Sequence, residues 1–239
     1  TDDTFAIARS YEASFNTLGI PFHCYCKKDN GIYEGMNNAV EHSSGSFINF
    51  MNAGDTFIAP DVLDHIFCKN DSTGTDIIYG DAVEYEYGRY YYFPKNYENI
   101  KYAMPFSHQS VFARRELLCR FPFKTSYRIA SDYDFLLTVS DLGCHFRDCG
   151  IPVCIITKDG LSTVDLYETF VETVSVQHAH GTDRFTEKQY VKKCRSAKIR
   201  QFGMKHFPEF IRLIIRRIQR YVRKQNTAVP ASVIENRCL

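Results

Sequence analysis

Apolar residues recur at helical spacing early in the chain, and a short continuous apolar run follows them. The helical stripe predicts an amphipathic helix that ends before Gly45, and its members are Ile32, Met36, Ala39 and Val40. The next run, FINFM at residues 47–51, predicts a core strand. The polar segment from Asn52 to Asp55 comes directly after it. Ligands of open α/β sheets bind beyond the carboxyl ends of strands, so this order predicts a binding crevice.

Two more segments show a clear pattern. In the sequence SDYDFLL, Ser131 is expected to cap a helix whose buried face consists of Phe135, Leu136, Val139 and Leu142. Alternating tyrosines and glutamates from Val83 to Glu98 predict an exposed hairpin arm with Gly88 at its turn. Contact with sugar rings and packing of an edge strand explain these tyrosines equally well.

Composition limits the class of protein without choosing one. The 239 residues, of which 44% are hydrophobic, suffice for one sizeable α/β core and a smaller appendage. Nine cysteines without CxxC or Cys/His ligand spacing argue for reduced thiols, and against a zinc site or a disulfide framework. The sequence shows neither a signal-peptide pattern nor an apolar stretch of the roughly 20 residues that span a bilayer. A cytoplasmic enzyme is consistent with all of this.

The charge of the chain is uneven. From Lys192 to Lys224 there are twelve Lys or Arg residues and one acid, a net +11; the whole chain carries +1, so the remainder carries −10. Within residues 205–224 one helical face is apolar and the other basic, which is typical of a helix on an anionic membrane surface. The alternative is an ordinary packed helix with a solvated face. Nucleic acid is not an expected partner, because no recognisable nucleic-acid-binding module accompanies these residues.

Four segments follow residues 27–55 in a characteristic order. They are YGDA at 79–82, MPFSHQSVFARREL at 104–117, IASDYDFLL at 129–137 and DGLST at 159–163. In order and spacing the set resembles the nucleotide-sugar glycosyltransferases of family 2, and in particular the bacterial members that assemble envelope polysaccharides and exopolysaccharides. Each segment alone is a weak motif, so the specificity lies in the order.

The resemblance implies an α/β fold of the GT-A type, a Rossmann-like mixed sheet flanked by helices, over residues 1–180. Residues 181–239 are then a helical, basic C-terminal appendage. The resemblance also implies an N-terminal truncation, because Thr1–Thr4 is similar to the tail of an Asp-rich turn that follows the second strand of family members. The alternative is a natural short form, in which Asp2 or Asp3 caps a first helix.

Transfer from a nucleotide diphosphate leaves negative charge on the departing group, and a divalent cation can neutralise it. Hard oxygen ligands suit Mg²⁺ or Mn²⁺. The resemblance implies that Asp55 binds this ion, since it matches the last acid of the family's Asp-x-Asp motif. Asn52 stands where many members carry the first acid, and it is expected to contact the substrate. The alternative is a simple turn, because Asn, Gly and Asp all favour turns.

An attacking acceptor hydroxyl must lose a proton, and a carboxylate opposite the leaving group can take it. Asp132 is the predicted base, because it matches the aspartate of the family's catalytic motif; Asp134 is expected to be secondary. Attack opposite to departure predicts inversion at the anomeric carbon. Acids in the first turn of a helix are also stabilised by the helix dipole whatever their function, which is the alternative for Asp132.

Other substrate contacts follow from the resemblance alone. Three residues near the start of the first predicted helix are expected to lie around the nucleotide: Asp29, Gly31 and Asn37. A glycine there allows close backbone approach, and exposed amides bind phosphate oxygens. His108 and Gln109 are expected to line the sugar or acceptor pocket. Tyr33 either borders the donor or only packs.

Two classes of function remain open. The first is an inverting, metal-dependent hexosyltransferase that uses a nucleotide-diphosphate sugar, with UDP as the expected nucleotide, and a lipid-linked or glycan acceptor. Such an enzyme is expected at the inner face of the cytoplasmic membrane. The second is a truncated, non-catalytic relative that binds a membrane or a partner. Asp55 and Asp132 favour the first class, and Asn52 favours the second.

Overall fold

The computed structural model describes residues 2–68, 72–86, 88–157, 160–208, 210–212, 214–215 and 228–229. Within these residues seven strands form one sheet. They are β1 (Phe47–Ile48), β2 (Thr56–Phe57), β3 (Ile77–Glu86), β4 (Arg89–Phe93), β5 (Val111–Arg114), β6 (Phe146–Thr157) and β7 (Ala228–Val229). The sheet is mixed, because β3 at its centre runs parallel to β6 and antiparallel to β4 and β5.

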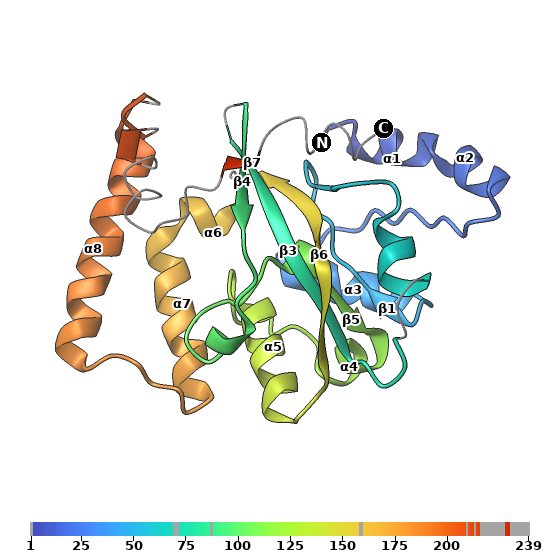
Figure 1. Ribbon diagram of the computed structural model, residues 1–239. Coiled ribbons are helices and arrows are strands. Elements are labelled where there is room, and N and C mark those ends of the chain that lie inside the picture. The colour runs from blue at the N-terminus through green and yellow to red at the C-terminus, as the bar shows by residue number, and fades with distance from the viewer. Residues whose placement is uncertain are drawn as a thin grey trace.

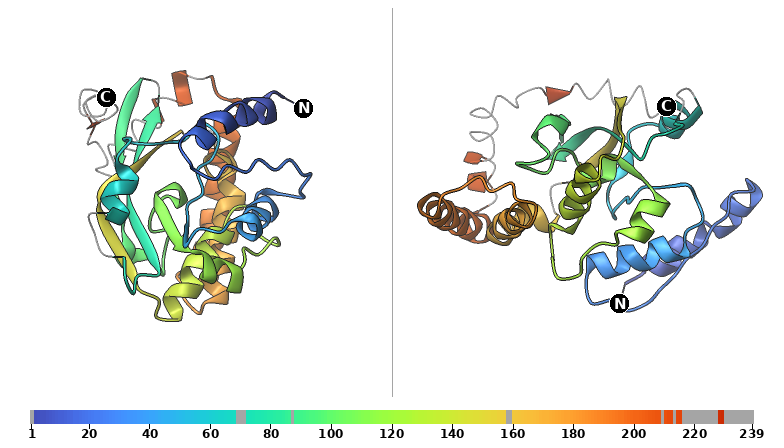
Figure 2. Two further views of the ribbon diagram at one scale, coloured as in Figure 1. Left: turned by 90° about the vertical axis from the view of Figure 1, so that its right-hand side faces the viewer. Right: turned by 90° about the horizontal axis from the view of Figure 1, so that it is seen from below.

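Helices lie on both sides of this sheet. They are α1 (Thr4–Ser10), α2 (Glu12–Thr17), α3 (Ile32–His42), α4 (Arg115–Arg120), α5 (Ser131–Asp141), α6 (Leu161–Val164), α7 (Leu166–Ala179) and α8 (Glu187–His206). A short 3-10 turn, η3 (His108–Ser110), precedes β5. In Figure 1 α7 and α8 lie to the left of the sheet and α1 and α2 lie at its upper right. Figure 2 shows α8 outside α7, farther from the sheet.

The basic C-terminal region is described only in part. Helix α8 packs against α7, and Gln201 of α8 accepts a hydrogen bond from the backbone N–H of Tyr167 at 2.7 Å. Most of the amphipathic segment predicted at residues 205–224 lies outside the described residues. No helix in the described part of the chain combines the length and the apolar character needed to cross a membrane.

The predicted helices form, but two of their faces differ from the prediction. In α3 the buried residues are Tyr33 and Val40, whereas Ile32 is 50% exposed. The prediction was based on apolar residues alone, whereas the aromatic ring of Tyr33 is the side chain that packs in the core. In α5 the residue at the cap position is Ala130, and Ser131 is buried inside the first turn. The predicted inward position of Leu142 is also wrong, because it follows the last turn and is 58% exposed.

The predicted core strand over residues 47–51 is shorter than expected. Only Phe47 and Ile48 pair with β5. At Asn49 the backbone pairing of the strand ends. The side-chain amide of Asn49 instead donates to the backbone carbonyls of Gln109 and Val111 at 2.9 and 2.8 Å. The chain therefore stays extended and reaches the 52–55 turn alongside η3.

Strand β3 separates two apolar clusters. Ile77 packs in the cluster under α3, α4, α5 and α7, whereas Ile78 packs in the cluster on the opposite face. Both side chains are fully buried. Successive residues of a strand point to opposite faces of the sheet. Because consecutive residues of β3 are apolar, this strand contributes side chains to the apolar clusters on both faces.

The pairing of β3 with β6 is irregular at Gly80, where the register shifts between Tyr79 and Asp81. A Cβ atom at Gly80 is placed 2.5 Å from the carbonyl oxygen of Ile151 and 2.6 Å from Sγ of Cys149. Real Cβ atoms do not approach a backbone oxygen so closely. The bulge therefore requires glycine, and it redirects the half of β6 that ends at the cleft described below.

We predict that Gly80→Ala lowers the free energy of unfolding by about 3 kcal/mol, because the added methyl group pushes β6 away from β3. Chemical denaturation measures this. Gly45→Ala is the matched control, since its Cβ meets only the carbonyl oxygen of Phe47 at 3.5 Å, an ordinary contact. Equal stability of the two variants contradicts the prediction.

Candidate active site

A tight turn after β1 positions Asp55. The backbone N–H of Asp55 donates to the carbonyl of Asn52 at 3.0 Å, and Gly54 has φ +89°, a conformation that favours glycine. The Asp55 carboxylate is held on both sides. Oδ1 accepts from the backbone N–H of Thr157 at 3.0 Å, and Oδ2 accepts from Nε2 of Gln109 at 2.6 Å. Asp55 thus lies between the end of β6 and η3.

His108 links this turn to α5. Its Nε2 lies 3.0 Å from Nδ2 of Asn52, and its Nδ1 lies 3.4 Å from Oδ2 of Asp132. An ionised Asp132 requires a proton on Nδ1, which leaves Nε2 to accept from the Asn52 amide. The chain of contacts from Asn52 through His108 to Asp132 therefore fits one tautomer of the histidine.

Asp132 lies in the first turn of α5, and its Oδ1 accepts two hydrogen bonds. The donors are the backbone N–H of Tyr133 at 2.9 Å and the hydroxyl of Tyr33 at 3.0 Å. The side chain of Asp132 is 19% exposed and that of His108 is 28% exposed. Both groups are thus largely enclosed but remain open on one side.

Glu172 of α7 fixes the loop before α5. Its carboxylate accepts from three consecutive backbone N–H groups, those of Arg128, Ile129 and Ala130, at 2.9, 2.7 and 3.0 Å. The same loop supplies the Ile129 carbonyl that accepts from Tyr33 at 2.6 Å. Three amides on one carboxylate leave this loop little freedom, and the loop in turn determines where α5 begins and where Asp132 lies.

A cleft of about 360 Å³ opens between these elements. Of the residues predicted to act on substrate, four line it: Asn52, His108, Gln109 and Asp132. Asp55 lies directly behind this wall, bonded to two lining residues, Gln109 and Thr157. The predicted base Asp132 thus lines the cleft, and the predicted metal ligand Asp55 lies behind its wall.

Three other predicted residues lie elsewhere. The side-chain amide of Asn37 makes two hydrogen bonds to the backbone of Phe123. It donates to the carbonyl at 2.8 Å and accepts from the N–H at 2.9 Å. Asp29 and Gly31 precede α3 and are exposed; the backbone N–H of Gly31 donates to Oδ1 of Asp29 at 3.3 Å. None of the three lines the cleft. Asn37 thus has a structural role in joining α3 to the loop after α4, and substrate contact by these three residues stays a prediction.

The sequence alone did not single out three of the residues that build the site. They are Tyr33, left undecided between packing and donor contact, together with Thr157 and Glu172. Neither Thr157 nor Glu172 gives a local signal, because each has its partner far away in the sequence. Thr157 donates its backbone N–H to the Asp55 side chain, and the Glu172 side chain accepts from backbone N–H groups of residues 128–130.

The thiol of Cys154, which lies beside the site, is unreactive. Burial and, as a smaller contribution, the negative charge of Asp55 together raise the pKa of Cys154 to about 12. The thiol stays protonated at neutral pH and is a poor nucleophile. The chemistry of this cleft therefore depends on its carboxylates, amides and imidazole.

Asp55 offers one carboxylate to a metal ion. In the described part of the chain, no three His, Cys, Asp or Glu side chains gather as a metal-binding group. Mg²⁺ commonly takes one or two protein carboxylates and completes its shell with phosphate oxygens and water. Asp55 thus fits an ion held mainly by a diphosphate ligand, and it does not by itself form a cage.

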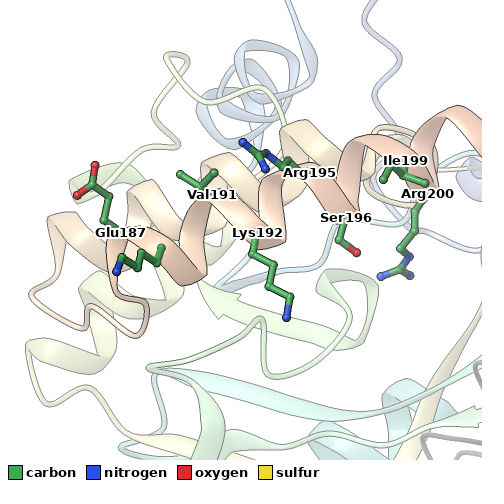
Figure 3. A pocket seen from close by; sticks show the side chains of 8 residues that line it. Glu187, Val191, Lys192, Arg195, Ser196, Ile199 and Arg200 are labelled. Carbon is green, nitrogen blue, oxygen red and sulfur yellow. The ribbon is translucent and has the colours of Figure 1, made fainter.

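A larger hollow, of about 700 Å³, lies along α8 and away from the cleft (Figure 3). All of its described lining residues come from this one helix: Glu187, Lys188, Val191, Lys192, Arg195, Ser196, Ile199 and Arg200. It contains one carboxylate and none of the convergent polar contacts of the cleft. Although this hollow is larger than the cleft, we do not assign it as the catalytic site.

No protein-family model matches the chain. Among curated proteins the chain is similar to PGL/p-HBAD biosynthesis glycosyltransferases of Mycobacterium bovis and Mycobacterium tuberculosis, with 26% identity over 141 residues. The match covers 56% of this chain and 52% of each relative. The chain thus spans about half the length of the curated relatives it matches.

Two solved structures share the architecture. The first is TarS 1-349 of S. aureus in complex with UDP-GlcNAc, with a TM-score of 0.54 and 18% identity over 74% of this chain and 54% of TarS 1-349. The second is a mannosyltransferase of Pyrobaculum calidifontis in complex with GDP-Man and Mn²⁺, with a TM-score of 0.54 and 16% identity over 92% of this chain and 68% of that one.

At these identities the structural likeness defines the fold alone. The fold is that of glycosyltransferases of the GT-A type, a mixed sheet flanked by helices, as the sequence predicted. The sequence relatives are glycosyltransferases as well.

We predict that Glu172→Ala lowers the free energy of unfolding by about 1–3 kcal/mol, because it leaves three backbone N–H groups without their acceptor. Thermal or chemical denaturation measures the loss. Glu187→Ala is the control, since Glu187 is an exposed glutamate in the first turn of α8. A Glu172 variant as stable as the control contradicts the anchoring role of this carboxylate.

Proposed function

We propose that the chain carries the donor site and catalytic site of an inverting glycosyltransferase, which moves a sugar from a nucleotide-diphosphate sugar to a lipid-linked or polysaccharide acceptor in bacterial cell-surface polysaccharide synthesis. One observation carries the proposal. On a GT-A fold, Asn52, His108 and Asp132 line one cleft in a chain of contacts of 3.0 and 3.4 Å. Gln109 lines the same cleft and donates to Asp55 at 2.6 Å. UDP is the proposed nucleotide, by analogy with the UDP-GlcNAc that TarS binds.

Asp55 is the proposed protein ligand for Mg²⁺ or Mn²⁺. When bound there, the ion neutralises charge that grows on the departing diphosphate. Gln109 and the N–H of Thr157 orient the carboxylate before any ligand binds, which lowers the cost of ordering it. The Mn²⁺ in the Pyrobaculum mannosyltransferase complex supports this assignment.

Asp132 is the proposed base. It accepts the proton of the acceptor hydroxyl as that oxygen attacks the anomeric carbon from the side opposite the diphosphate, which inverts the configuration there. His108 orients the carboxylate from the cleft side through Nδ1. Asn52 and Gln109 border the same space and are the proposed hydrogen-bond donors to the transferred sugar.

A peripheral place on the cytoplasmic face of the membrane completes the proposal. Phe210 and Ile214, on the apolar side of the predicted amphipathic segment, are 63% and 53% exposed. Basic residues of the same region attract anionic lipid by about 1 kcal/mol each near the surface. Residence at the membrane suits an enzyme whose acceptor is linked to lipid.

A second candidate is a non-catalytic relative that binds a membrane or partner. It is favoured by Asn52, an amide at a position where the resemblance expects an acid, and by the single carboxylate of the turn. Hydrolysis of UDP-GlcNAc and GDP-mannose by the chain, assayed with and without Mn²⁺, separates the two candidates. The absence of any turnover of these nucleotide sugars by the chain favours the second.

We predict that Asp132→Asn reduces transfer or donor hydrolysis at least about 100-fold, because an amide cannot accept the proton, while the affinity for UDP or GDP changes little. Rate assays and calorimetric titration with the nucleotide measure the two quantities. Asp141→Asn, at the other end of α5, is the control. Near-normal turnover by Asp132→Asn contradicts the assignment of the base.

We predict that Asp55→Asn weakens the activation of the enzyme by Mn²⁺ at least about tenfold, since the charged ligand is lost and the shape is kept. A titration of rate against Mn²⁺ concentration measures it. Asp61→Asn, an exposed aspartate on the segment after β2, serves as the control. An unchanged Mn²⁺ response in Asp55→Asn contradicts the metal assignment.

A further inference from the structure

Tyr33 joins the start of α3 to the base. It lies in the first turn of α3, after Gly31, and it is 6% exposed. Its hydroxyl oxygen lies 2.6 Å from the carbonyl oxygen of Ile129 and 3.0 Å from Oδ1 of Asp132. The ring packs against Phe123, with ring centroids 5.5 Å apart. Both ends of the side chain are therefore fixed by contacts across the cleft wall.

The Tyr33 hydroxyl acts only as a donor toward these two oxygens. Burial raises its pKa far above the usual value, and the charge of Asp132 adds to this effect. The hydroxyl therefore keeps its proton, and that proton lies between two acceptors. Because Ile129 belongs to the loop that Glu172 holds, the tyrosine ties the carboxylate to a backbone that is itself anchored.

The two oxygens of Asp132 consequently differ. Oδ1 accepts hydrogen bonds from the Tyr33 hydroxyl and from the backbone N–H of Tyr133. Oδ2 has one longer contact, of 3.4 Å, to Nδ1 of His108. Behind His108 and Asp132 lies an apolar void of about 30 Å³, lined by side chains that include Met36, Phe50 and Phe123. This void offers no further polar partner, so the carboxylate loses hydrogen bonds if its plane turns.

We propose that Tyr33 is a positioning residue for the base: its hydroxyl holds the Asp132 carboxylate so that Oδ2, the oxygen beside His108, receives the proton of the attacking hydroxyl. The inference rests on the proposed function. In the step the acceptor O–H bond breaks and its proton goes to Oδ2. The acceptor oxygen bonds to the anomeric carbon, and the bond from that carbon to the diphosphate oxygen breaks, with its electron pair leaving on the nucleotide.

The test is Tyr33→Phe, which removes one oxygen and keeps the ring. Hydrolysis of UDP-GlcNAc and GDP-mannose, in which water replaces the acceptor, is measured in parallel with calorimetric binding of UDP and GDP. The maximal rate kcat is expected to fall about tenfold, because the base is less well oriented. The donor KM and nucleotide affinity are expected to stay within twofold of the unsubstituted protein.

Tyr79→Phe is the matched control. It also removes a buried tyrosine hydroxyl, but Tyr79 lies in β3, is 9% exposed and does not line the cleft. Its kcat and nucleotide affinity are expected to stay within twofold of the unsubstituted protein. A Tyr33→Phe rate within twofold of the unsubstituted protein, an equal loss in Tyr79→Phe, or a parallel loss of nucleotide affinity overturns the inference.

Failure of the proposed function gives a different result. In that case the unsubstituted protein itself does not turn over either nucleotide sugar. A protein that turns them over and is insensitive to Tyr33→Phe keeps its proposed function and loses only the positioning role of the tyrosine.

Discussion

The carboxylate of Asp132 is the point on which the site depends, because elements from distant parts of the chain meet there. Helix α3 contributes the Tyr33 hydroxyl, η3 contributes His108, and α5 contributes the N–H of Tyr133. Each of these hydrogen-bonding groups offsets part of the desolvation free energy that burial of the Asp132 carboxylate costs.

The sheet supplies the second half of the site. The long parallel pair β3 and β6 crosses the middle of the molecule, and the bulge at Gly80 lets the strands approach closely enough to bury Ile77 and Val153. The end of β6 then presents the N–H of Thr157 to Asp55. Packing in the core therefore fixes the position of a polar group at the rim.

Several elements follow from local pattern, and the errors in them have a common cause. The spacing of apolar residues predicts α3 and α5, and alternation predicts the hairpin of β3 and β4, all of which form. The hairpin is not the exposed arm that the alternation predicts, because Val83 and Glu86 are buried. The pattern placed Ile32 and Leu142 inside, yet both are exposed, since apolar character does not say which neighbour is available to cover a residue. The strand after α3 is short because the Asn49 amide satisfies carbonyls that a ladder usually pairs.

The sequence by itself determined the α/β class, the order of the motifs and four polar residues of the cleft, because residue types and spacing carry local preferences and chemical capacity. Only the tertiary structure decided that Asn37 bonds to Phe123, that Glu172 anchors the loop before α5, and that Tyr33 reaches Asp132. Those contacts join groups 43 to 99 positions apart. Such pairs depend on how helices and strands pack, and a local pattern has no information about a partner that the fold alone brings near.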